Sequence, residues 1–342
     1  MSEQEQRFSF IGNSSDYFVI WIVNLILTIL TLGIYSAWAK VRRLQYLYRN
    51  TRLAGSSFDY HGTPIAILKG RLIAIVLFAS YSIFLQLMPA LGLAIGLIIA
   101  LIMPYFFVTS LRFRLYNSSY RGLRFGFSGS VKSAYINFLL LPIASALTLF
   151  ILAPYTHHRS KAYQHNNSHF GQSNFSFDAT IASFYKIYFF VFLQIVTVVG
   201  LFALGIYLMF QGSWSNLPKM AIFAIVAGVY LLLIFTSLLV IPYFIARIQN
   251  LIWNHTALGE HRFICNMGAR GLTWIILSNF FLIAMTMGIF KPFADIRLLR
   301  YKLEHLALLP SDSLDNFIAS EKQHVSATGT ESAEIFDVDI SL

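Results

Sequence analysis

Residues 37–62 read AWAKVRRLQYLYRNTRLAGSSFDYHG, and the fold can be argued outward from this stretch. Its first half places Trp38, Arg42, Tyr46 and Asn50 at steps of four residues. Side chains four positions apart lie on one face of an α-helix. The stretch therefore predicts a helix that leaves an apolar segment with an aromatic and basic face.

The second half of the stretch predicts a turn and a short extended segment. Asn50-Thr51 and Gly55 indicate the turn, because asparagine and glycine supply local hydrogen bonds and positive φ. Phe58 and Tyr60 then alternate at a period of two before Gly62. That period is typical of an extended segment with one buried face.

The same features return along the chain, each time after a small residue or proline (Ala37, Pro104, Pro154, Pro242 and Pro292). The helix face returns as Tyr155, Arg159, Tyr163 and Asn167, as Tyr105, Thr109, Phe113 and Asn117, as Tyr243 and Arg247, and as Phe293, Arg297, Tyr301 and His305. The aromatic pair returns as Phe125 and Phe127, as Phe175 and Phe177, and as Phe263 with Cys265, while the amino terminus already carries Phe8, Phe10 and Gly12. Such recurrence predicts internal repeats built by duplication.

Composition assigns the chain to the membrane. It is 57% hydrophobic and 12% charged, with a mean hydropathy of +0.64, whereas soluble domains carry about 25% charged residues. A membrane-spanning helix needs roughly 20 mostly apolar residues. Seven candidate spans can be read, at Tyr17–Tyr35, Ile65–Met88, Leu91–Ser110, Ala134–Tyr155, Ile181–Phe210, Met220–Ala246 and Leu272–Pro292.

The predicted fold is all-α, a polytopic transmembrane helical bundle of about seven spans, with internal repeats and short extended segments at the membrane interface. Residues 1–16 form a leader, 17–309 the transmembrane domain, and 310–342 an acidic tail predicted to be disordered. Within the domain, unit one covers 17–133, unit two 134–270, and a terminal half-unit 271–309. Three spans per unit predict an inverted repeat, as in many secondary transporters. If the lone spans were re-entrant hairpins, every copy of the motif would instead face one side.

Charge predicts the orientation. The net charge of +10 divides into +16 for the body through Leu309 and −6 for the tail from Pro310. With seven crossings, one side receives seventeen Lys and Arg residues and the other seven. Because cytoplasmic loops are richer in Lys and Arg, we expect the carboxyl terminus in the cytoplasm and the amino terminus outside.

The run Thr31–Arg42, continuing through Tyr46 to Gly55, Phe58 and Gly62, resembles the signature of the YjgN family of bacterial inner-membrane proteins. The copy at Gly288–Ala294, with Arg297 and Tyr301, and the ending Phe336–Ile340 are similar to it. The resemblance covers almost the whole chain and implies a multi-pass protein of the bacterial inner membrane. The molecular function of that family is unknown, so the resemblance supplies no catalytic or ligand-binding residues.

Two sets of residues are candidates for function. The first is the repeated motif, namely Trp38, Arg42, Tyr46, Tyr155, Arg159, Tyr163, Tyr243, Arg247, Phe293, Arg297 and Tyr301. These side chains anchor spans at the interface or bind an anionic headgroup, since guanidinium groups suit phosphate and carboxylate. The second set, Asn24, Gln86, Gln194 and Asn279, consists of polar side chains within spans, which either join helices or line a polar path.

Other chemistry is disfavoured. None of the fifteen carboxylates falls in mid-span, which argues against carboxylate-based proton coupling. Four histidines (His157, His158, His165 and His169) could hold a transition metal, but the pattern favours a solvated loop. Cys265 is the only cysteine, so no disulfide can form within the chain.

No nucleophile paired with a base, no phosphate-binding loop and no nucleic-acid module is found, so we expect neither an enzyme nor a cofactor. The expected partners are the lipid bilayer and its anionic headgroups, and the oligomeric state stays open. Two functions remain: a transporter or channel-like protein for a small, anionic solute, and a non-catalytic membrane module that organises lipids or envelope proteins.

Overall fold

The computed structural model describes residues 5–210 and 219–323, and its centre is a β-sheet that an all-α prediction did not contain. The strands are β1 (Gln6–Arg7), β2 (Ser9–Phe10), β3 (Thr51–Leu53), β4 (Ser56–Tyr60), β5 (Ser118–Tyr120), β6 (Leu123–Phe127), β7 (Ser168–Phe170), β8 (Ser173–Phe177), β9 (Thr256–Leu258), β10 (His261–Cys265) and β11 (Leu306–Leu309). The predicted short extended segments are therefore confirmed, but the all-α fold class is wrong.

The sheet closes almost completely on itself. Its antiparallel order is β1-β11-β10-β9-β8-β7-β6-β5-β4-β3-β2, so β1 and β2 occupy the two ends of the order. These two strands are separated in the chain by Phe8 alone, whose N–H donates to the Leu306 carbonyl. The amino-terminal segment thus bridges the two edges, and the sheet becomes a nearly closed barrel with no long unpaired edge.

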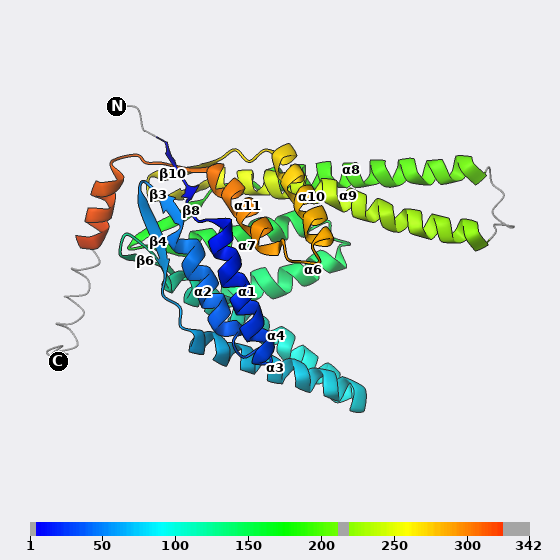
Figure 1. Ribbon diagram of the computed structural model, residues 1–342, viewed down its shortest axis with the longest axis horizontal. Helices are drawn as coiled ribbons and strands as arrows, with labels where there is room; N and C mark the ends of the chain where they lie inside the picture. Colours follow the sequence, from blue (N-terminus) through cyan, green and yellow to red (C-terminus); the bar gives the residue numbers. More distant parts are fainter. Residues whose placement is uncertain (1–4, 211–218, 324–342) are drawn as a thin grey trace.

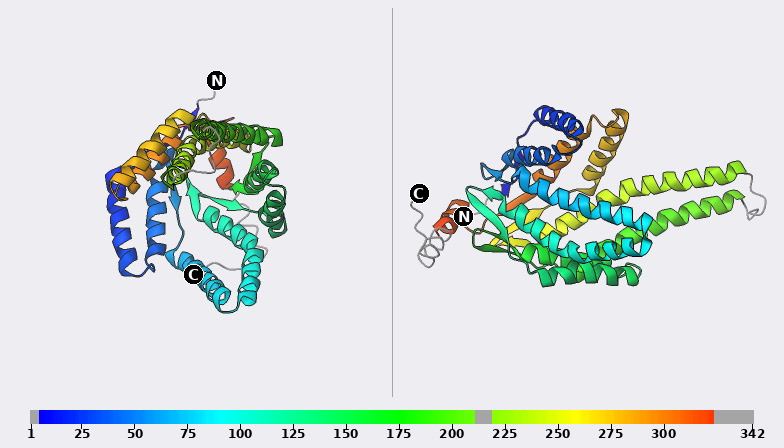
Figure 2. Two further views of the ribbon diagram at one scale, coloured as in Figure 1. Left: turned by 90° about the vertical axis from the view of Figure 1, so that its right-hand side faces the viewer. Right: turned by 90° about the horizontal axis from the view of Figure 1, so that it is seen from below.

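The helices surround the axis of this barrel. They are α1 (Ser14–Leu30), α2 (Ser36–Arg49), α3 (Pro64–Leu87), α4 (Pro89–Tyr116), α5 (Val131–Tyr135), the π-helix η1 (Ile136–Leu140), α6 (Leu141–Leu147), α7 (Ala153–Asn166), α8 (Ile181–Phe210), α9 (Lys219–Asn254), α10 (Ala269–Met285) and α11 (Lys291–Glu304), followed by an unlabelled helix at 314–323. Each helix from α1 to α11 packs on the next in the chain, and α11 packs on α1. The helices therefore form a closed ring (Figures 1 and 2).

The seven predicted spans are corrected to four. Among the described residues, only α3, α4, α8 and α9 are long and apolar enough to cross a membrane. The other apolar stretches belong to three short pairs, α1 with α2, α5–α6 with α7, and α10 with α11, which turn back at residues 31–35, 148–152 and 286–290. The returning helices α2, α7 and α11 have 14 residues each, or about 21 Å. That falls short of the roughly 30 Å hydrocarbon core.

The three turning points share one local structure. At the first, Thr31 Oγ1 donates to the Leu27 carbonyl and accepts from the Tyr35 N–H, at 2.7 and 2.9 Å. Thr148 and Thr286 make the same pair of contacts in the other two turns. A hydroxyl that satisfies both helix ends allows the chain to reverse within five residues, and hydropathy alone does not register such a reversal.

Local side-chain bonds also form the end of each helix that leads into a strand. The side chains of Asn50, Asn117 and Asn167 donate to the carbonyl four residues earlier, and His255 and His305 contact the equivalent carbonyl. These bonds satisfy carbonyls that a helix end leaves free, and a strand follows directly. The order of helix, cap and strand thus recurs within the fold, whereas its origin by duplication stays a prediction.

The inverted arrangement and the opposite placement of the termini are wrong. All strands join one sheet, so the extended segments of every copy of the motif lie on one side of the helix ring. β1 pairs with β11, which places the amino-terminal strand beside the last one. The lone apolar stretches turn back as helix hairpins, as the re-entrant alternative expected, while their position in the bilayer stays a prediction. The prediction of a disordered tail is also corrected for residues 314–323, which are helical, while 324–342 lie outside the described residues.

Candidate functional site: an apolar barrel and its mouth

The interior of the barrel is lined by one aromatic residue from each of the five extended segments that carry a pair. We call Phe8, Phe58, Phe125, Phe175 and Phe263 the phenylalanine ring. Ring centroids lie 6.1 Å apart for Phe8 and Phe58, 6.4 Å for Phe58 and Phe125, and 6.2 Å for Phe175 and Phe263. The period of two that predicted these strands thus places the first aromatic of every pair toward the axis.

The second residue of each pair closes the barrel toward the helices. Phe10, Tyr60, Phe127, Phe177 and Cys265 are all buried. Phe10 packs with Tyr17 and Ile296, so it joins the sheet to the helix ring. A Cβ added at Gly129 would approach the Phe127 ring to 2.5 Å, which explains why glycine follows the aromatic there.

A cavity of about 180 Å³ remains inside the barrel. Besides the phenylalanine ring, its walls are Leu53, Tyr120, Phe170, Trp253, Leu258, Leu306, Leu308, Leu314 and Phe317. An unfilled apolar cavity costs about 24 cal/mol per Å³, or roughly 4 kcal/mol here. Apolar cavities of this size stay dry and accept apolar molecules. The geometry is therefore suited to a hydrocarbon group and not to an ion.

The mouth of the barrel, opposite the helix ring, is covered by the helix at 314–323 (Figure 1). Leu314 and Phe317 line the cavity, and Ile318 is buried. Phe317 stacks on Phe170 with a centroid distance of 6.3 Å. Phe317 also packs edge-on against the His261 ring, with the centroids 4.3 Å apart. His261 Nδ1 accepts from the N–H of Ser311, just before the helix, at 3.1 Å, and burial lowers the pKa of this imidazole.

Two carboxylates hold this helix in place. Glu321 is only 6% exposed and accepts from the backbone N–H of Gln172, at 2.6 Å, and from Ser173 Oγ, at 2.7 Å. Asp315 forms an ion pair with Arg121 at the tip of the β5–β6 hairpin. Sequence reasoning missed these contacts because the partners are separated by 149 and 194 residues.

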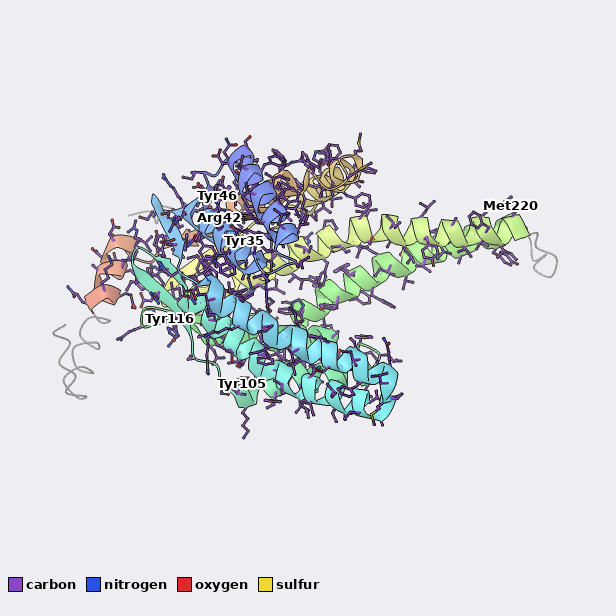
Figure 3. The ribbon with its side chains drawn as sticks, turned by 60° about the horizontal axis from the view of Figure 1, so that its bottom comes forward. Tyr35, Arg42, Tyr46, Tyr105, Tyr116 and Met220 are labelled. Carbon is purple, nitrogen blue, oxygen red and sulfur yellow. The ribbon has the colours of Figure 1, made fainter. Side chains whose placement is uncertain are left out.

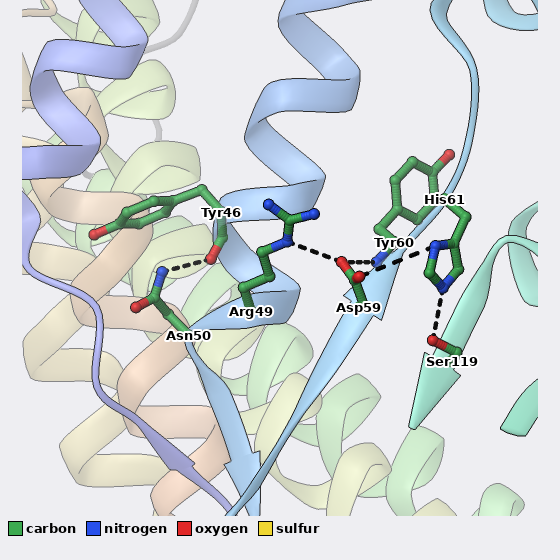
Figure 4. Close-up of polar contacts among 7 residues, drawn as sticks. All are labelled: Tyr46, Arg49, Asn50, Asp59, Tyr60, His61 and Ser119. Carbon is green, nitrogen blue, oxygen red and sulfur yellow. Dashed lines mark hydrogen bonds and ion pairs between the residues drawn. The ribbon is translucent and has the colours of Figure 1, made fainter. Parts of the chain in front are cut away.

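On the outer face of the sheet, a polar cluster ties α2 to β4 and β5 (Figure 4). Arg49 Nε donates to Asp59 Oδ1 at 3.0 Å, and His61 Nε2 contacts Ser119 Oγ at 2.8 Å. Burial alone would raise the pKa of Asp59, but bonds from Arg49 and the Tyr60 N–H lower it overall. His61 Nδ1 lies 4.0 Å from Asp59 Oδ2, which exceeds hydrogen-bond length. Asp59 and His61 therefore approach each other only at ion-pair distance, while Arg49 and Ser119 are their hydrogen-bond partners.

The predicted motif residues do not gather into one site. Tyr46, Tyr163 and Tyr301 each donate a hydrogen bond to the carbonyl just before the first helix of their own pair, at 2.6, 2.8 and 2.7 Å. Arg42 donates to the hydroxyl of Tyr35, which lies directly before α2, and Arg42 and Tyr46 lie on that helix (Figure 3). Their interfacial role stays a prediction.

The remaining motif residues make contacts within a helix pair or between neighbouring pairs. Trp38 stacks on Tyr35, Phe293 packs on Phe18, and Arg247 lies over the Tyr243 ring at 5.4 Å. Tyr155 and Arg159 lie on α7, where the arginine is exposed. The motif thus shapes helix pairs all around the ring.

The four residues of the predicted polar path occupy separate positions. Asn279 is buried between α10 and α11, where it donates to the Ala294 carbonyl and accepts from Arg297 at 2.8 Å. Asn24 approaches the Ala39 carbonyl in the α1–α2 pair. Gln86 is exposed on α3, and Gln194 lines a hollow beside α9 and α10. Two of the four thus serve helix pairing.

The prediction of a solvated histidine loop is wrong for three of its residues, because α7 continues through them. His157 Nδ1 contacts the Tyr188 hydroxyl and His158 Nε2 the Ala179 carbonyl, at 3.0 and 2.8 Å. His165 packs against Phe177, and burial together with nearby Lys161 lowers its pKa to about 4. His157 thus packs between helices, and His158 and His165 pack between α7 and β8.

Comparison with known proteins gives a family and a membrane location for relatives. A family model described as a bacterial protein of unknown function, DUF898, matches residues 5–335. The chain is 35% identical over 145 residues to the inner membrane protein YjgN of Salmonella typhimurium, covering 42% of this chain and 36% of that protein. It is 32% identical over 162 residues to YjgN of Escherichia coli K12, covering 45% and 39%.

The chain therefore spans less than half the length of these curated relatives. No solved structure matches it. Since the relatives are named inner membrane proteins and the described chain holds four helices able to cross a bilayer, we conclude that this is an integral membrane protein.

Proposed function

The chain belongs to the DUF898 family of bacterial proteins of unknown function, and on that premise we propose that it is a non-catalytic inner-membrane module that holds the hydrocarbon part of a lipid inside its barrel. One observation carries the proposal: a nearly closed sheet, joined to a ring of helices, contains an apolar cavity of about 180 Å³. Retaining such a cavity costs stability, and binding an apolar group recovers it.

Charge supports a cytoplasmic position for the barrel. The turn at Met88, which joins α3 to α4, contains no charged residue, and the far end of the other long pair has one basic residue, Lys219. Arg52, Arg124 and Arg262 lie in the strands. Because basic residues remain on the cytoplasmic side, we place the barrel and the described end of the chain there.

A transporter for a small anionic solute is the weaker proposal. Such a protein needs a polar cavity near the middle of the membrane. Its candidate residues are instead distributed over separate helices, and Asn279 is occupied by Arg297. The apolar lining of the barrel supports the lipid-binding module that the sequence also left open.

The test measures binding of a fluorescent long-chain fatty acid to the full chain in nanodiscs of zwitterionic lipid. Leu258→Trp fills the cavity, because Leu258 lines it, and we expect roughly tenfold weaker binding, about 1.4 kcal/mol. Ile264→Trp is the matched control, since Ile264 is exposed on the neighbouring strand. Equal binding by both variants, or none by the wild type, contradicts the proposal.

A further inference from the structure

We propose that the helix at 314–323 occupies the place of an anionic amphiphile, a single hydrocarbon chain ending in a carboxylate or phosphate, which displaces it from the barrel mouth. This inference rests on the proposed function and specifies its ligand and its regulation. It is carried by the contacts of the helix, which combine an apolar side in the cavity with two anionic groups at the rim.

The apolar side of the helix fills part of the cavity. Leu314 and Phe317 stand among the residues that line it, and Ile318 is 4% exposed. These side chains come from the carboxyl-terminal segment and not from a strand, so the barrel wall remains complete without them. Withdrawal of the helix would enlarge the cavity and open it at the mouth, where a hydrocarbon chain could take the same volume.

The first anionic group marks a site built from backbone N–H groups. Glu321 receives hydrogen bonds from the N–H of Gln172 and of Ser173, at 2.6 and 3.3 Å, and from Ser173 Oγ. The turn begins at Gly171, with φ of +59°. Successive N–H groups in such a turn form a concave anion site. A buried carboxylate is costly without partners of this kind, so the turn selects for negative charge.

The second anionic group marks an oriented arginine. Arg121 Nε donates to Ser56 Oγ at 2.8 Å and its Nη2 donates to the Ala54 carbonyl at 2.9 Å, which leaves Nη1 directed at Asp315. Arg121 has φ of +49°, a conformation that is unfavourable for a side chain other than glycine or asparagine. The hairpin tip thus holds a guanidinium in a fixed position at the mouth.

The ion pair with Asp315 is easily exchanged. The Asp315 side chain is 81% exposed while that of Arg121 is 19% exposed, and exposed ion pairs contribute little to stability. An incoming carboxylate or phosphate can replace Asp315 on an arginine that is already oriented, and it gains the hydrophobic contact with the cavity at the same time. The helix and the ligand then compete for one place.

Two substitutions that break the same ion pair separate this proposal from a purely structural role. Asp315→Asn weakens docking of the helix and leaves Arg121 free. Arg121→Gln weakens docking equally but removes the cation. The readout is the ratio of affinities for an anionic and a neutral amphiphile of equal chain length, measured on the full chain in zwitterionic nanodiscs. The probes are a fatty acid, a lysophosphatidic acid and a monoacylglycerol.

We expect Asp315→Asn to raise the affinity for the anionic probes by roughly threefold, within the range of an exposed ion pair. Arg121→Gln should bring the anionic-to-neutral ratio close to one. The preferred anionic probe identifies the source, a free fatty acid or a phospholipid. Glu321→Gln serves as a second release variant, and it should raise neutral binding as well because the helix is displaced.

Displacement itself is followed by limited trypsin cleavage after Lys322, at the end of the docked helix. Saturating anionic probe should accelerate cleavage in the wild type, and the monoacylglycerol should do so less. The proposed competition between helix and ligand is wrong if the anionic-to-neutral affinity ratio is equal in the wild type, Asp315→Asn and Arg121→Gln, or if the probe leaves cleavage unchanged. Either result leaves the proposal of lipid binding in the barrel intact. If no probe binds the wild type or any variant, both the proposed function and the proposed competition are wrong.

Discussion

The long pair α3–α4 and the short pair α10–α11 both begin with an apolar helix, yet they meet the membrane differently. The long pair has 24 and 28 residues and reverses at a single residue, Met88. The short pair has 17 and 14 residues and reverses over residues 286–290. Their difference teaches that hydropathy detects where apolar helices occur, while length and the returning partner decide which helices cross.

The largest expected effect is one of topology, tested by cysteine labelling in a Cys265→Ala background. Met88→Cys should react with an impermeant maleimide from outside the cell, because the long pair reaches that side. Met287→Cys should not, although Met287 is 96% exposed in the protein, because the short pair turns back within the bilayer. Ser57→Cys on the barrel is the control and should react only after permeabilisation.

The comparison breaks if Met287→Cys reacts as fast as Met88→Cys. Reporter fusions after Arg52, Arg121, His169, Arg262 and Lys302 give an independent check. All five should report one side, because the strands beside them belong to one sheet.

The next effect concerns the glycine that brings the long helices together. A Cβ at Gly92 would overlap the backbone of Leu85, which cannot move aside as a flexible side chain would. Gly92→Ala should therefore destabilise the protein by about 3 kcal/mol, at the upper end for overpacking. The measurement is thermal unfolding in detergent. Gly205→Ala, where a Cβ meets nothing within 4 Å, should be neutral or slightly stabilising.

The short pair depends on a buried polar bond in place of close backbone packing. Asn279→Ala removes the acceptor of Arg297 and the donor to the Ala294 carbonyl, so we expect a loss of about 2 kcal/mol. Gln86→Ala in the long pair should change stability by less than about 0.5 kcal/mol, because Gln86 is exposed. Equal losses for the two variants would remove this distinction between the pairs.

The smallest effect lies in the turn of the short pair. Gly288 has φ of +95°, and a Cβ added there would meet no atom within 4 Å. Gly288→Ala should therefore lower the free energy of unfolding by about 1 kcal/mol, the cost of this backbone conformation for a residue with a side chain. Gly288→Asn should recover part of that loss, since asparagine tolerates positive φ better than alanine. An unchanged melting temperature for Gly288→Ala would show that the turn does not require this conformation.

Much of the local structure could be predicted because it depends on neighbours in the chain. The steps of four from Trp38 to Asn50 predicted the helix face, and α2 ends where Asn50 bonds back to Tyr46. The alternation of Phe58 and Tyr60 predicted β4. The prediction of seven crossings failed because Thr31 and Thr286 each close a reversal by hydrogen bonds that hydropathy does not measure.

The candidate site was only partly within reach of the sequence. The aromatic pairs contained the phenylalanine ring, and Phe8 and Phe10 were among them. The sequence could not show that this segment closes a barrel, because it pairs with β11, some 300 residues later in the chain. Glu321 and Arg121 carried no local signal, because each acts on a distant part of the chain.

By itself, the sequence determined a membrane protein with five copies of a helix, turn and extended segment, since apolar length and side-chain periodicity act over a few residues. Only the tertiary structure decided that the extended segments join into one barrel, because strands form hydrogen bonds between segments and not within them. It also decided which apolar helices are long enough to cross a membrane, and that the helix at 314–323 returns to cover the barrel mouth.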